Sequence, residues 1–109
     1  MRLHATFTLL TPSMHPDVKM ALDAMFNLGE RYAREEATIQ DLRAQVRVTL
    51  AQLEDCGAPP SLKSYVQIWD DAVNRHWNEW GLNKKALSTE EFVAWLCEEI
   101  ELAQKPGFL

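Results

Sequence analysis

The first residues of the chain alternate between apolar and polar side chains, whereas the rest repeats apolar side chains every three or four residues. Alternation is typical of a strand with one buried face, and the positions on that face are Leu3, Ala5, Phe7 and Leu9. A lone strand leaves its backbone hydrogen-bonding groups unpaired. We therefore expect residues 1–11 to form either a strand that pairs with its copy in a second chain or an extended arm packed across its own helices.

Residues 16–55 carry a helical pattern that begins where Pro16 suits the first helical position. Thr38 and Asp41 have the spacing of a capping box, which would restart a helix, so this stretch is either one long helix or two. Its later apolar side chains follow a heptad register of the kind that packs helices together. Together with the strand, this register predicts a homodimer whose interface includes Tyr32, Ile39, Leu42, Val46 and Leu53.

Two further helices follow, and both have clear start and stop signals. The sequence Cys-Gly-Ala-Pro-Pro at 56–60 predicts a chain reversal, because the glycine ends a helix and the prolines cannot continue it. A helix is predicted over 61–80. Ser88 and Glu91 form a second capping box that predicts a last helix over 88–105. The expected fold is mainly α, with an N-terminal strand or arm followed by three or four helices in a helix-hairpin or bundle arrangement.

Composition indicates one globular domain over residues 1–109, since 47% of the residues are hydrophobic and 25% are charged. The formal net charge of −5 argues against nucleic-acid binding, because the basic residues form no cluster in the sequence. No apolar run is long enough for a membrane span. The two cysteines are too few for a disulfide framework. We therefore expect a cytoplasmic protein that binds neither nucleic acid nor membrane.

Residues suited to catalysis or metal binding are sparse in this sequence. The three histidines, His4, His15 and His76, have neither the spacing of a helical metal site nor nearby cysteines. Glycine-rich phosphate loops and nucleophile motifs are lacking as well. We therefore expect no catalytic residue, no metal site, no cofactor and no enzymatic activity.

Tryptophan is the unusual feature, because three of the four tryptophans fall in the predicted helix over 61–80. Core packing explains part of this aromatic face. Since tryptophan and tyrosine are enriched at the energetic centres of protein interfaces, part of it is also expected to contact a partner. The candidate partner-binding residues are Tyr65, Trp69, Trp77 and Trp80, of which at least one is expected to stay accessible.

These features favour a small regulatory protein that modulates or inhibits another protein through helical surfaces, for example an antagonist of a transcription factor. An alternative is a nucleic-acid-mimicking inhibitor, since the last predicted helix has five glutamates against one lysine. A third possibility is a small structural subunit of a larger assembly.

Overall fold

The structure is a computed structural model that describes residues 15–77 and 86–105, and these residues form four α-helices. The helices are α2 (Pro16–Ala33), α3 (Ile39–Asp55), α4 (Pro60–Trp77) and α5 (Thr89–Ala103). The described part of the chain is therefore all-α, which confirms the predicted fold class. The predicted strand or arm, with Leu3, Ala5, Phe7 and Leu9, lies outside the described residues.

Residues 16–55 form two helices, so the alternative that the sequence left open is resolved. After α2 ends at Ala33, Glu35 adopts a left-handed backbone conformation with φ of 63°, which interrupts helical geometry. The predicted capping box then begins α3. The Thr38 hydroxyl accepts a hydrogen bond from the Asp41 N–H at 3.1 Å, and the Asp41 carboxylate accepts one from the Thr38 N–H at 3.3 Å. The heptad positions are thus divided between two helices.

The other start and stop signals predicted from the sequence also lie at helix ends in the structure. Gly57 follows α3 with φ of 63°, a conformation that glycine adopts at little cost, and α4 begins at Pro60. The last residues of the predicted helix over 61–80 lie outside the described residues. At the start of α5, the Ser88 hydroxyl and the Glu91 carboxylate form the second capping box.

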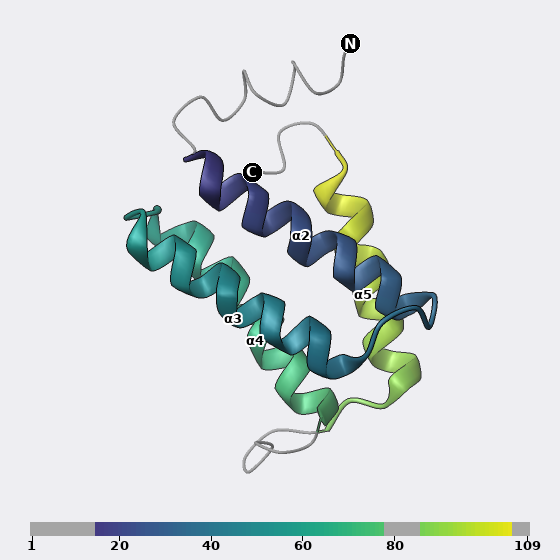
Figure 1. Ribbon diagram of the computed structural model, residues 1–109. Coiled ribbons are helices and arrows are strands. Elements are labelled where there is room, and N and C mark those ends of the chain that lie inside the picture. Colours follow the sequence, from purple (N-terminus) through teal and green to yellow (C-terminus); the bar gives the residue numbers. More distant parts are fainter. Residues whose placement is uncertain (1–14, 78–85, 106–109) are drawn as a thin grey trace.

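In the bundle, α3 packs against α2 and α4, and α5 packs against the same two helices from the other side (Figure 1). Contacts between Glu54 and Lys63 and between Arg47 and Asp70 show that α3 and α4 run antiparallel. Each helix turns its apolar stripe inward. The resulting core consists of Val18, Leu22, Met25, Leu42, Val46, Leu53, Val66, Trp69, Ala72, Val73, Phe92 and Leu96.

The heptad residues lie largely inside this core. Leu42 and Val46 are 0% exposed and Leu53 is 1% exposed, while Tyr32 and Ile39 are half-buried against them. These side chains pack within a single chain and offer little surface to a second copy. The homodimer therefore remains a prediction that rests chiefly on residues 1–11.

Candidate protein-binding surface

Trp69 is the centre of the core and is 0% exposed. Its indole contacts the ring of Phe26 edge-on at 5.4 Å and the ring of Trp95 at 5.2 Å between centroids. Room for it exists because α2 carries Gly29 at this point, where an added Cβ would lie 3.1 Å from the indole. In this fold Trp69 has no surface to offer to a partner.

Tyr65, the second candidate, is half-buried and joins α4 to α5. Its hydroxyl donates to the Glu99 carboxylate at 2.9 Å and accepts from the Trp69 indole N–H at 3.0 Å. Burial raises the pKa of Tyr65 well above the ordinary value for a tyrosine. With the hydroxyl engaged in both bonds, the evident role of Tyr65 is to hold the two helices together.

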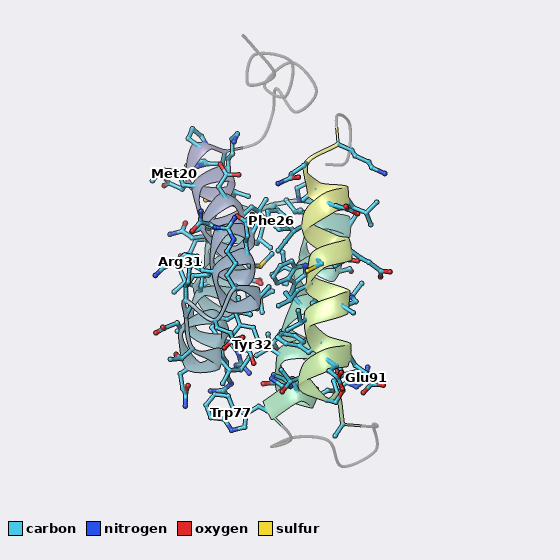
Figure 2. The ribbon with its side chains drawn as sticks, turned by 90° about the vertical axis from the view of Figure 1, so that its right-hand side faces the viewer. Met20, Phe26, Arg31, Tyr32, Trp77 and Glu91 are labelled. Carbon is cyan, nitrogen blue, oxygen red and sulfur yellow. The ribbon has the colours of Figure 1, made fainter. Side chains whose placement is uncertain are left out.

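Trp77 is half-buried and, unlike Trp69 and Tyr65, belongs neither to the core cluster nor to the side chains packed against it. Eight residues separate it from Trp69, which turns it about 80° around the helix axis. Figure 2 shows the Trp77 ring at the end of α4, clear of the side chains that fill the space between the helices. The fourth candidate, Trp80, lies outside the described residues.

An arginine of α3 lies over the half-buried ring of Trp77. The guanidinium carbon of Arg43 is 5.4 Å from the centroid of Trp77, within the range of a cation–π interaction. The Arg43 Nε–H also donates to the side-chain oxygen of Asn74 at 3.3 Å. The Trp77 ring and the Asn74 oxygen both belong to α4, and together they fix the position of the Arg43 side chain against that helix.

Next to this pair, a row of polar contacts runs along the outer edge between α3 and α4. The Arg47 Nε–H donates to the Asp70 carboxylate at 2.9 Å, and the Asn74 amide donates to the other oxygen of Asp70 at 3.5 Å. We call Arg43, Arg47, Asp70, Asn74 and Trp77 together the Trp77 surface. It combines one aromatic ring, two arginines and two polar acceptors on two antiparallel helices.

Of these five residues, the sequence pattern identified only Trp77. Arg43 and Arg47 are four residues apart on one helix, and Asp70 and Asn74 are four apart on the next. This spacing places each pair on one helical face. It could have indicated matching polar edges, but the register between the two helices was needed to show which residues meet.

His76 makes its contacts within the fold, with residues of other helices and of the segment before α5. Its Nε2 lies 2.7 Å from the Tyr32 hydroxyl, and its Nδ1 lies 3.1 Å from the main-chain oxygen of Leu87. Because a carbonyl oxygen only accepts, Nδ1 carries the proton and Nε2 accepts from Tyr32. The ring also stacks on Phe92 at 4.7 Å, and burial raises the pKa of Tyr32. His76 thus ties α2, α4 and the start of α5 together, and Figure 2 shows Tyr32 pointing from α2 towards them.

The acidic side chains of α5 are partly engaged within the fold. Glu91 caps the helix and Glu99 accepts from Tyr65. Glu90, Glu98 and Glu101 are exposed. In residues 15–77 and 86–105, no group of three histidine, cysteine, aspartate or glutamate side chains could hold a metal ion. Within the same ranges, no helix combines the length and apolar character that crossing a membrane requires.

Comparisons with protein-family models, curated proteins and solved structures gave no match for this chain.

Proposed function

We propose that this chain is a small non-catalytic regulatory protein that binds another protein through the Trp77 surface and thereby modulates or inhibits it. One observation carries the proposal: Trp77, alone among the described aromatic candidates, lies outside the core and the side chains packed against it, and an arginine lies over its half-buried ring. Tryptophan and arginine are the residue types most enriched among interface residues that dominate binding energy. Their pairing at one point outside the core favours a protein interface.

The arrangement of the pair supports the same conclusion. Binding is weakened by the entropy that flexible side chains lose when they become ordered, and arginine is among the most flexible. Here the Arg43 side chain is already held by Asn74 and by the indole. A partner therefore meets a surface whose side chains are largely in place.

The nucleic-acid-mimicking alternative receives less support. A phosphate mimic needs a row of free carboxylates along one face. Two of the five glutamates of α5 are instead bonded within the fold, Glu91 at the helix start and Glu99 at Tyr65. The Trp77 surface lies on α3 and α4, whereas the three remaining glutamates lie on α5.

The test compares the native chain with Trp77→Ala and with a control, Met20→Ala, as bait in the native cell. Met20 is 70% exposed on α2, and Figure 2 shows its side chain pointing away from the bundle. A captured protein is then purified, and its affinity for the three baits is measured by calorimetry. We expect Trp77→Ala to lose at least about 2 kcal/mol of binding free energy, which is roughly 30-fold in Kd.

Two results would contradict the proposal. One is equal affinity of the native chain and Trp77→Ala for every captured protein. The other is an equal loss in Met20→Ala, because the binding energy would then come from apolar exposure in general and not from this surface.

A further inference from the structure

The polar row between α3 and α4 contains one position that differs from its neighbours. Lys63 of α4 pairs with Glu54 of α3, and Arg47 of α3 pairs with Asp70 of α4. Arg43 comes next in the row, but it faces the neutral amide of Asn74. Arg43 forms no ion pair with any acidic residue in the part of the chain that the structure describes.

Asn74 orients Arg43 without neutralising it. Its amide nitrogen donates to Asp70 at 3.5 Å, which turns its oxygen towards the Arg43 Nε–H. A guanidinium has five N–H donors, and this contact uses only the one at Nε. The guanidinium carbon of Arg43 also lies over the indole ring of Trp77. The other N–H groups are thus held in a fixed plane beside an apolar ring, an arrangement suited to a two-pronged bond with a carboxylate.

We infer that the Trp77 surface binds an acidic peptide segment of its partner, in which an aspartate or glutamate pairs with Arg43 and an adjacent apolar side chain packs on Trp77. This inference rests on the proposed function and specifies its partner. A single carboxylate is favoured over a nucleic acid because the Trp77 surface offers only one arginine without an acidic partner: Arg43 faces Asn74, whereas Arg47 is already paired with Asp70. Binding along a phosphate backbone needs several adjacent cations.

The substitution Asn74→Asp tests the inference by supplying the missing carboxylate from within the chain. An aspartate here would pair with Arg43 as Asp70 pairs with Arg47, and the partner's carboxylate would meet a neutralised site. Asn27→Asp is the matched control, because it makes the same chemical change at an exposed position of α2. The melting temperature of each variant shows that it folds.

A displayed library of short random peptides is selected on the native chain, and the recovered peptides are synthesised. We expect them to be enriched in aspartate or glutamate beside an apolar residue. Asn74→Asp should weaken their binding about tenfold, as should replacing the peptide's Glu by Gln, while Asn27→Asp leaves it unchanged. Binding should also weaken as salt increases.

The outcomes separate the inference from the proposed function. If Trp77→Ala abolishes peptide binding but Asn74→Asp does not, the surface binds protein and the acidic partner is refuted. Failure to recover peptides that depend on Trp77 would overturn both. A single-stranded oligonucleotide that binds the native chain more tightly than the recovered peptides, and loses binding in Asn74→Asp, would replace the acidic segment by nucleic acid.

Discussion

Replacing Gly29 by alanine is expected to destabilise the protein, although alanine is the better helix former. Gly29 is buried in the interior of α2 and faces α4 and α5. A Cβ at this position would lie 3.1 Å from two ring carbons of Trp69 and 3.4 Å from a methyl carbon of Leu96. Either the indole or the backbone of α2 must move to make room for it.

The magnitude follows from two opposing effects. Alanine in a helix interior gains about 1 kcal/mol over glycine. Overpacking a filled core costs about 1–3 kcal/mol, and the upper half of this range applies when the neighbour cannot move. Trp69 is 0% exposed, lies between Phe26 and Trp95, and is hydrogen-bonded to Tyr65. We therefore expect a net loss of about 1 kcal/mol and a melting temperature roughly 4 °C lower.

Urea denaturation of Gly29→Ala measures this loss, with Asn27→Ala as the control. Asn27 is exposed two residues earlier on α2, so alanine there should stabilise the protein by about 0.5 kcal/mol. Trp69→Phe removes the ring carbons that the new Cβ would meet. In that background Gly29→Ala should no longer destabilise, which is a coupling of about 1–2 kcal/mol. A Gly29→Ala variant more stable than the native chain would refute the reasoning.

Four other predictions can be measured directly. Trp69→Ala should cost about 3–5 kcal/mol of unfolding free energy and Trp77→Ala about 1 kcal/mol or less, because only the first is in the core; equal losses would contradict this assignment. Because the pKa of Tyr65 is raised in the folded protein, this tyrosine ionises first in the unfolded chain as pH rises through about 10. Urea titrations should therefore show that the free energy of unfolding falls above that pH, and that it falls less in Tyr65→Phe. Light scattering should give twice the 12.5 kDa mass of one chain and the single mass after deletion of residues 1–10; a monomeric full chain would end the homodimer prediction. Gel shifts at low salt should show no retarded DNA, and a salt-sensitive shift would reveal a basic patch formed on folding.

Helix boundaries were predictable because the signals that set them are local. The capping boxes at Thr38 and at Ser88 each involve a residue only three positions away, and Gly57 acts through its own backbone. Whether residues 16–55 formed one helix or two was harder to predict. Tyr32 and Ile39 keep the heptad spacing across the break, so apolar periodicity continued where the backbone did not.

Of the candidate surface, the sequence pointed to Trp77 but ranked it equally with Trp69. Helical period places both on one broad aromatic face, and it holds no information on where the neighbouring helices lie. Packing against Gly29 and Trp95 buries Trp69, while the 80° rotation leaves Trp77 at the edge of the bundle.

The contacts of Arg43 depend entirely on the way the helices assemble. Arg43 and Asn74 are 31 residues apart, and they meet because α3 and α4 run antiparallel in one particular register. That register follows from the fit of core side chains such as Val46 and Val73 across all the helices. Local signals can set where a helix begins and which way each side chain points, whereas the neighbour that a side chain meets depends on the packing of the whole core.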